Sequence, residues 1–236
     1  MPNHVTNVVA LKGERRMVEA VMRAIQEDAR GFGSISFQKI IPMPESLNML
    51  AGSCTDRGLK EYRKYLAQYP GEAEGANAEA SEQQYLQEHK EIEPGDWVLG
   101  KQAYNNIMLY GAPTWYEWCI QNWGTKWDAY DMDMSGAEDG VLRFFTAWSA
   151  PHPVIQKLAE LCPEVEIEHS WADEDIGSNC GKRKYSQGVL SREFLPTYGR
   201  SSVDFAAEVM GVSPEDYGLR LNSEGTDYIY EEGMHL

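Results

Sequence analysis

Near its start the chain shows the apolar patterns of a strand, a helix and a second strand. Residues 4–11 are rich in β-branched side chains, and residues 34–41 alternate between apolar and polar positions, so both read as strands. Between them, apolar residues recur at helical spacing over residues 14–29 and predict a helix with one buried face. That face comprises Val18, Val21, Met22 and Ile25. We expect Gly31 and Gly33 to end this helix.

The same order of elements returns in the second half of the chain. Residues 141–148 are apolar on both strand faces, which predicts a strand that is covered on both sides. Two prolines then predict a helix start, and residues 164–171 alternate strictly between glutamates and apolar residues, with His169 on the apolar side. Residues 178–190 fit either a hairpin or an added edge strand.

The middle of the chain has a different, mainly helical pattern. Helices are expected over residues 56–69, 79–90 and 97–110. The small and acidic residues 70–80 predict a mobile loop between the first two of these helices. A fourth helix is expected to begin at Trp115.

Without residues 42–138, the expected elements follow the order strand, helix, strand, strand, helix, strand. This is the βαββαβ order of the ferredoxin-like fold, an α+β architecture with an antiparallel sheet. The sequence therefore predicts a ferredoxin-like domain from residues 1–41 and 139–190, with the helical insertion between its second and third strands. Residues 191–236 are expected to form a C-terminal extension packed on the sheet domain.

Four of the seven tryptophans lie between residues 115 and 127. Thr114 and Glu117 have the spacing of a capping box for a helix that ends at Gly124. So much aromatic surface indicates a second core or a docking surface, and the helical spacing favours a core that covers strand 141–148. The candidate binding residues at this seam are Trp115, Trp118, Trp123, Lys126, Trp127, Asp128 and Tyr130.

The chain has 37 acidic and 21 basic residues, which gives a formal net charge of −16. An acidic surface repels phosphate backbones and anionic lipid, so nucleic-acid and membrane binding are disfavoured. The charge either keeps the protein soluble or imitates the phosphates of DNA towards a basic partner. The most regular candidate for such an acidic surface is Glu164, Glu166 and Glu168, followed by Asp173, Glu174 and Asp175.

No motif in the sequence fixes a catalytic or cofactor-binding site. The four cysteines are scattered, the five histidines lie far apart, and no phosphate-binding loop is recognisable, so we expect no metal and no cofactor. We interpret His169 as a core histidine. For the basic run from Lys182 to Lys184, a solvated hairpin tip or pairing with the neighbouring acidic strand is favoured over contact with phosphate. Neither a signal peptide nor a membrane-spanning stretch is recognisable, which favours the cytoplasm.

Phage- and plasmid-encoded proteins of the YubB-like type resemble this chain in the runs WCIQNWGTKWDAYD, VLRFFTAWSAPHPVIQKLAELCP and DYGLRLNSEGTDYIY. The resemblance extends over nearly the whole chain. It implies a ferredoxin-like domain in an otherwise uncharacterised accessory protein of a mobile element. It implies no catalytic residues and no iron–sulfur cluster, because the name of the fold describes only a topology.

The sequence favours a non-enzymatic protein of a mobile element that binds a host or defence protein, either as an acidic inhibitor or as a DNA mimic. The reasons are the net charge of −16, the tryptophan cluster and the lack of a catalytic motif. Two alternatives stay open. One is a ferredoxin-like nucleic-acid-binding module that uses aromatic residues such as Phe144 or Trp148 together with the basic residues Lys182 to Lys184. The other is an enzyme or small-ligand binder with its site at the tryptophan-rich seam.

Overall fold

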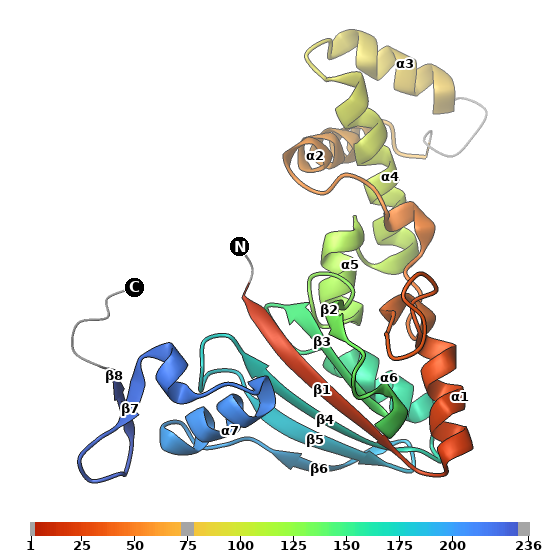
Figure 1. The fold of residues 1–236 in the computed structure, drawn as a ribbon. Helices are drawn as coiled ribbons and strands as arrows, with labels where there is room; N and C mark the ends of the chain where they lie inside the picture. Colours follow the sequence, from red (N-terminus) through yellow and green to blue (C-terminus); the bar gives the residue numbers. More distant parts are fainter. Residues whose placement is uncertain (1–2, 72–77, 231–236) are drawn as a thin grey trace. The chain divides into compact units, whose positions relative to one another are not determined.

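A computed structural model describes residues 3–71 and 78–230 of the chain (Figure 1). The mobile loop expected over residues 70–80 lies largely outside the described residues. By its internal contacts the chain divides into two compact units. The sheet unit comprises Met1–Pro42 and Asn122–Leu236, and the helical unit comprises Met43–Gln121. Residues 122–138, which we expected in the helical insertion, therefore belong to the sheet unit.

The sheet unit contains a six-stranded sheet in the order β2-β3-β1-β4-β5-β6, and every neighbouring pair is antiparallel. The strands are β1 (His4–Lys12), β2 (Tyr130–Asp133), β3 (Val141–Ala147), β4 (Glu166–Asp173), β5 (Gly181–Ser186) and β6 (Val189–Phe194). Helix α1 (Arg15–Ile25) follows β1, and helix α6 (His152–Leu161) connects β3 to β4. The predicted α+β class is confirmed, and β1-α1-β2-β3-α6-β4 has the βαββαβ order.

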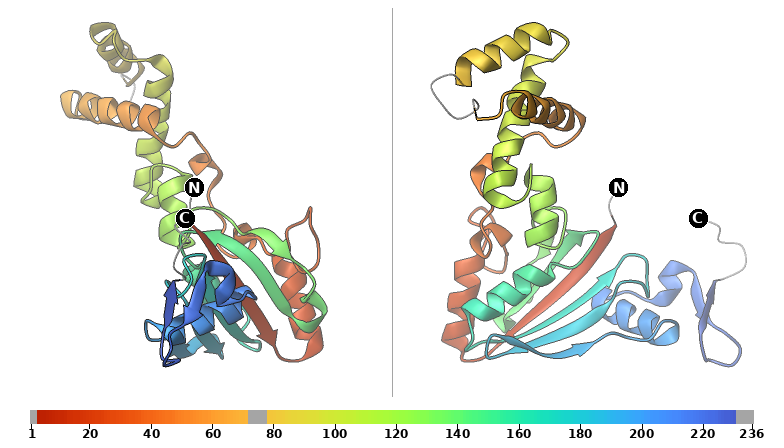
Figure 2. Two further views of the ribbon diagram at one scale, coloured as in Figure 1. Left: turned by 60° about the vertical axis from the view of Figure 1, so that its left-hand side comes forward. Right: turned by 180° about the vertical axis from the view of Figure 1, so that it is seen from behind.

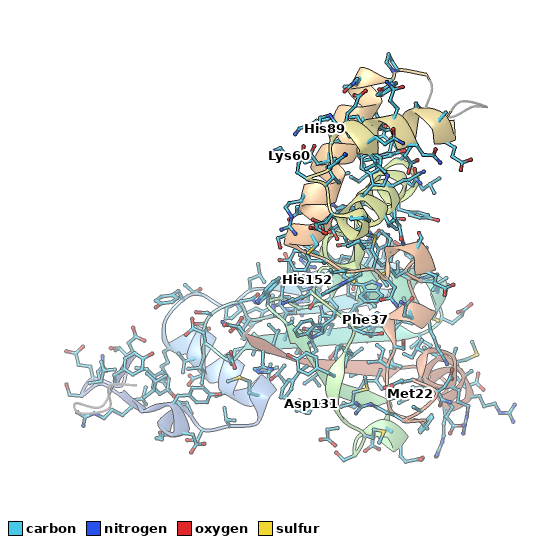
Figure 3. All side chains as sticks on the ribbon, turned by 90° about the horizontal axis from the view of Figure 1, so that it is seen from above. Met22, Phe37, Lys60, His89, Asp131 and His152 are labelled. Atoms are coloured by element: carbon cyan, nitrogen blue, oxygen red, sulfur yellow. The ribbon has the colours of Figure 1, made fainter. Side chains whose placement is uncertain are left out.

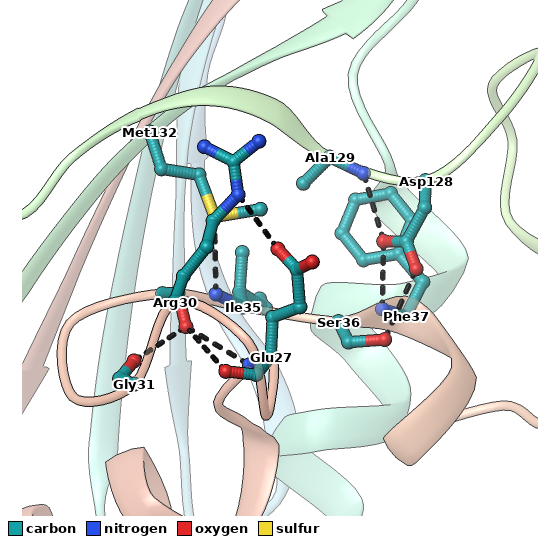
Figure 4. A network of polar contacts seen from close by, with 10 residues as sticks. Glu27, Arg30, Gly31, Ile35, Ser36, Phe37, Asp128, Ala129 and Met132 are labelled. Atoms are coloured by element: carbon teal, nitrogen blue, oxygen red, sulfur yellow. Dashed lines mark hydrogen bonds and ion pairs between the residues drawn. The ribbon is translucent and has the colours of Figure 1, made fainter.

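The prediction of a strand at residues 34–41 is wrong. These residues form an irregular segment with a 3₁₀ turn, η1 (Phe37–Lys39). The N–H of Phe37 donates to the carboxylate of Asp128 at 2.8 Å, and the N–H of Ile35 faces the sulfur of Met132 at 3.5 Å (Figure 4). Side chains thus take the place of a neighbouring strand, and the alternation in the sequence reflects burial of Ile35 and Phe37.

The position of the helical insertion must be corrected for the same reason. The second strand of the fold is β2, which begins at Tyr130. The helical unit is therefore inserted between α1 and β2, and not between the second and third strands as predicted. Helix α1 has the predicted buried face but ends at Ile25, before the expected Gly31 and Gly33.

Different helices cover the two faces of the sheet, as the views in Figures 1 and 2 show. On one face, Val154, Ile155 and Leu158 of α6 are fully buried. On the other face, Val8 of β1 packs with residues of α7 (Arg200–Met210). The C-terminal helix, and not the tryptophan segment, is therefore the second cover of the sheet. A small two-stranded sheet, β7 (Leu219–Leu221) with β8 (Tyr228–Tyr230), follows α7.

The helical unit has its own aromatic core. Its helices are α2 (Ser53–Gln68), α3 (Ala78–Glu88), α4 (Pro94–Tyr110) and α5 (Trp115–Asn122), which confirms the helices expected here. The core comprises Tyr62, Tyr65, Tyr85 and Trp97. Helices α2 and α4 approach closely at Gly58 and Gly100, where a Cβ on either residue would lie 2.0 Å or less from the backbone of the other helix. No helix within residues 3–71 and 78–230 is long and apolar enough to cross a bilayer.

Candidate binding surface at one end of the sheet

The predicted seam residues are divided between the two units. Trp115 and Trp118 lie on α5 in the helical unit, whereas the other five lie in the sheet unit. Trp118 and Trp123 are buried. The indole N–H of Trp123 donates to the carbonyl of Ile41 at 2.9 Å. Its ring packs edge to face with the ring of Phe37, with 5.8 Å between the ring centroids. These two tryptophans thus have a core role.

Asp128 stabilises the fold of the sheet unit. Its carboxylate accepts hydrogen bonds from the N–H of Phe37 at 2.8 Å, the hydroxyl of Ser36 at 3.1 Å and the N–H of Ala129 at 2.8 Å (Figure 4). Burial raises the pKa of Asp128, although these hydrogen bonds favour its charged form. We therefore assign Asp128 to the packing of the irregular segment and not to ligand binding.

Lys126, Trp127 and Trp148 form a cation–aromatic cluster on the surface. The ammonium of Lys126 lies 4.6 Å from the ring centroid of Trp127 and 4.7 Å from that of Trp148. Trp148 directly follows β3 and is 40% exposed. Its φ of 71° is in the left-handed region, which costs a non-glycine residue about 1–2 kcal/mol. A large aromatic side chain is thus presented to solvent from a strained backbone.

Tyr130 extends this cluster towards acidic side chains. Its hydroxyl is 2.8 Å from Nδ1 of His4, and its ring meets that of Trp127 at 6.4 Å. Burial, with the nearby charges of Asp131 and Glu174, raises the pKa of Tyr130 to about 12. Both carboxylates are exposed. We define the tryptophan–acid surface as Lys126, Trp127, Tyr130, Asp131, Trp148 and Glu174.

The predicted acidic stripe on β4 is neutralised by lysines. Glu168 lies 2.9 Å from Lys12 and 2.8 Å from Lys182, and Glu166 lies 2.7 Å from Lys184. Hydrogen bonds from Lys182 and Lys12 lower the pKa of Glu168 to about 2. Pairing of the basic run with the acidic strand is therefore confirmed, and the two glutamates do not form an open anionic array.

The other predicted acidic residues have separate positions. Glu164 is exposed in the turn before β4. Asp173 is buried, and its carboxylate accepts from the side chains of Asn3 at 3.1 Å and Asn179 at 3.3 Å. Glu174 and Asp175 are exposed. Of the predicted acidic residues, only Glu174 is thus placed on the tryptophan–acid surface.

A cavity of about 560 Å³, which sequence reasoning missed, lies beside this surface in the sheet unit. Asn179 lines the cavity and donates to the carbonyl of Trp148 at 3.4 Å. The cavity is lined by His152, Trp171, Gly177, Ser178, Asn179, Cys180, Arg183, Leu195, Pro196 and Tyr198. In the sequence, the presence of Trp171 and His169 on one strand face was a weak sign of this cavity. The cavity itself could not be predicted, because the start of α6 and the end of β4 meet only in the folded chain.

The titratable groups at the cavity are poorly suited to catalysis. Burial and the charge of Arg183 lower the pKa of His152 to about 4, so the imidazole is neutral at physiological pH. Burial raises the pKa of the Cys180 thiol, which disfavours the nucleophilic thiolate. His169 is fully buried, as predicted, and its Nε2 lies 2.9 Å from Oδ1 of Asn7. Among the described residues, no three His, Cys, Asp or Glu side chains converge as metal ligands would.

Comparison with known proteins identifies one domain of the chain. Residues 122–213 match the family described as "Ferredoxin-like domain in Api92-like protein". The solved structure of protein api92 from Yersinia pseudotuberculosis aligns with 84% of this chain and 99% of its own, at 11% identity and a TM-score of 0.40. None of the curated proteins matches. The expected ferredoxin-like domain is therefore confirmed for residues 122–213, which are similar to the ferredoxin-like domain of Api92-like proteins.

Proposed function

We propose that the protein acts by binding another protein, without catalysis, through the tryptophan–acid surface. The observation that carries this proposal is Trp148, a residue that is 40% exposed although its backbone is left-handed with a φ of 71°. Glycine would adopt this backbone without strain. Strained residues concentrate at functional sites, and exposed tryptophan and tyrosine side chains often dominate the energy of protein–protein contacts.

The charge around the tryptophans favours a partner with a basic contact surface. Asp131 and Glu174 are exposed beside Tyr130, and the chain as a whole carries a net charge of −16. Lys126 is the exception, but its ammonium lies between two indole rings. Complementary charge would accelerate the encounter with a basic partner, and the aromatic rings would supply the apolar contact.

The geometry favours this local surface over the DNA-mimic form of the hypothesis. An imitation of DNA needs a row of unpaired negative charges. Glu166 and Glu168 are instead paired with lysines from β1 and β5. Phe144 is buried, so it cannot stack with a base as the nucleic-acid-binding alternative requires.

The resemblance to YubB-like proteins supports a biological setting for this binding. In that setting the protein is a phage- or plasmid-encoded accessory protein that acts in the bacterial cytoplasm. Its partner is a host or defence protein, which the accessory protein inhibits by occupying a basic surface.

The test is quantitative affinity capture from bacterial lysate with the full chain and two variants. Trp148→Gly removes the indole and suits the backbone. Leu161→Ala removes an exposed apolar side chain that is not part of the tryptophan–acid surface, at the last residue of α6. We expect the wild type and Leu161→Ala to retain the same basic protein in stoichiometric amount, and Trp148→Gly to lose most of it. Failure of the wild type to retain a stoichiometric partner, or equal retention by Trp148→Gly, would contradict the proposal.

A further inference from the structure

The cavity in the sheet unit is open to solvent on one side and has a mixed polar and apolar lining. Its volume of about 560 Å³ lies within the range of known ligand pockets, roughly 300–1,000 Å³. The lining comes from β4, β5, the start of α6, the loop that joins β4 to β5, and residues 195–198 after β6. His152 at the start of α6 marks its position in Figure 3.

The lining of the cavity contains an arginine and no carboxylate among its described residues. Of the described residues that line the cavity, Arg183 alone carries a formal charge at neutral pH, since His152 is neutral there. No carboxylate is among these lining residues, although the whole chain has a net charge of −16. Because Arg183 is paired with Glu193, its contribution to ligand binding would come from its remaining N–H donors, which suit a carboxylate or another hydrogen-bond acceptor.

Arg183 is held in place and keeps donors for such a ligand. Its Nε donates to the carboxylate of Glu193 at 2.7 Å, and the guanidinium lies 5.6 Å from the ring centroid of Trp171. A guanidinium has five N–H donors, so these contacts leave donors that can bind a second carboxylate.

The other walls suit a flat apolar body. The rings of His152 and Trp171 pack edge to face, with 4.4 Å between their centroids. Leu195 is 58% exposed and Tyr198 is 90% exposed, so a ligand would cover apolar surface that now faces solvent. Nδ1 of His152 is buried and has no hydrogen-bond partner within the described part of the chain.

We infer that the cavity binds a small organic acid with a flat aromatic body. The carboxylate would bind the guanidinium of Arg183, and the aromatic ring would lie against the exposed side chains of Leu195 and Tyr198. This site differs from the tryptophan–acid surface, and the inference does not depend on the proposed binding of a protein partner.

The first test compares two probes of nearly the same shape, one with a carboxylate and one with a neutral amide. Isothermal titration calorimetry of the full chain at low ionic strength would measure the binding of indole-3-acetate and of its neutral isostere indole-3-acetamide. A charge-assisted hydrogen bond is worth about 1.5–3 kcal/mol, so we expect the amide to bind roughly tenfold to a hundredfold more weakly. Equal affinity of the two probes, or no binding of indole-3-acetate at millimolar concentration, would overturn the inference.

Matched variants then locate the binding in the cavity. Arg183→Gln removes the cation, whereas Arg192→Gln removes an exposed arginine of the same hairpin that does not line the cavity. We expect Arg183→Gln to weaken the binding of indole-3-acetate at least tenfold and Arg192→Gln to leave it unchanged. Tyr198→Ala changes a side chain that is almost fully exposed, so the fold is retained, and it should weaken binding severalfold. Equal losses in the two arginine variants, or unchanged affinity in Tyr198→Ala, would show that the probe binds elsewhere.

Discussion

Asn179 donates a hydrogen bond from its side-chain amide to the backbone carbonyl of Trp148 at 3.4 Å, and both residues have a left-handed backbone. The same amide reaches the carboxylate of Asp173 at 3.3 Å. The loop after β4 is thereby attached to the residue that follows β3. This contact joins the tryptophan–acid surface to the wall of the cavity, and it links Asn179, a residue type that tolerates a positive φ, to the strained backbone of Trp148.

Replacement of Trp148 by glycine or alanine measures the strain at this position. Alanine is normally more stabilising than glycine, but at a φ of 71° the order is expected to reverse by about 1 kcal/mol. Urea unfolding monitored by circular dichroism gives the two free energies of unfolding. If Trp148→Ala were as stable as Trp148→Gly, the left-handed backbone at residue 148 would be refuted.

The crossing of α2 and α4 depends on two glycines. A Cβ on Gly58 would lie 1.7 Å from the carbonyl oxygen of Asp96, so Gly58→Ala must separate the two helices. We expect it to destabilise the helical unit by about 2 kcal/mol or more, since overpacking against a backbone cannot be relieved by side-chain rotation. Thermal unfolding followed at 222 nm measures the loss.

Gly95→Ala is the matched control for that substitution. Gly95 lies in the first turn of α4, and a Cβ there meets no atom within 4 Å. Alanine has the higher helix propensity, so the control is expected to leave stability unchanged or raise it by up to about 1 kcal/mol. A loss of stability in Gly95→Ala as large as that in Gly58→Ala would mean that the close helix crossing is not the cause.

Neutralisation of Glu168 tests the ion pairs that replace the predicted acidic array. Glu168→Gln leaves Lys12, Lys182 and Lys184 close together without their shared carboxylate. We expect a loss of about 1 kcal/mol at low salt that shrinks at high salt, because partly exposed charges are screened. Glu164→Gln, at an exposed position in the turn before the strand, is the control and is expected to change stability little. A loss that is independent of salt would argue against the pairing.

Periodicity in the sequence predicted elements such as α1 and β4 well, because each of them buries one face and exposes the other. The alternation over residues 164–171 correctly placed Ile167, His169 and Trp171 on the buried side of β4. Helical spacing likewise gave the buried face of α1. Segment 34–41 failed because the partner of Phe37 is the side chain of Asp128, which is 91 residues away in the chain. A pattern within one short stretch of sequence cannot predict a hydrogen-bond partner so far away in the chain.

The candidate surface was predicted in part. Trp127, Lys126 and Tyr130 were selected because the tryptophans are clustered in the sequence, and the structure brings them together with Trp148. The strain at Trp148 was not predictable, since a positive φ is expected only for glycine and asparagine. The cavity was missed for a different reason. Its wall combines His152 with residues of β5 and of the chain after β6, and only the tertiary fold brings these segments together.

Acid is expected to destabilise the sheet unit through the buried His169 and the partly buried His152. Burial lowers the pKa of His152 to about 4 and that of His169 well below 6.5, whereas both have a pKa near 6.5 in the unfolded chain. Between these values the unfolded state binds more protons than the folded state. The free energy of unfolding therefore falls as the pH is lowered from about 6.5 towards 4, by at most about 1.4 kcal/mol per pH unit for each histidine.

The contribution of His152 can be separated by His152→Gln, which cannot take up a proton in this range. We expect the variant to lose less stability than the wild type between pH 6.5 and pH 4, as measured by urea unfolding at a series of pH values. Burial raises the pKa of Asp128 in the folded state, so its protonation stabilises the folded protein as the pH falls. Asp128 is present in both the wild type and the variant, so its contribution cancels when their pH dependences are compared. An identical pH dependence of wild type and variant would show that His152 is accessible to protons in the folded protein, and the neutral imidazole assigned to the cavity wall would then be incorrect.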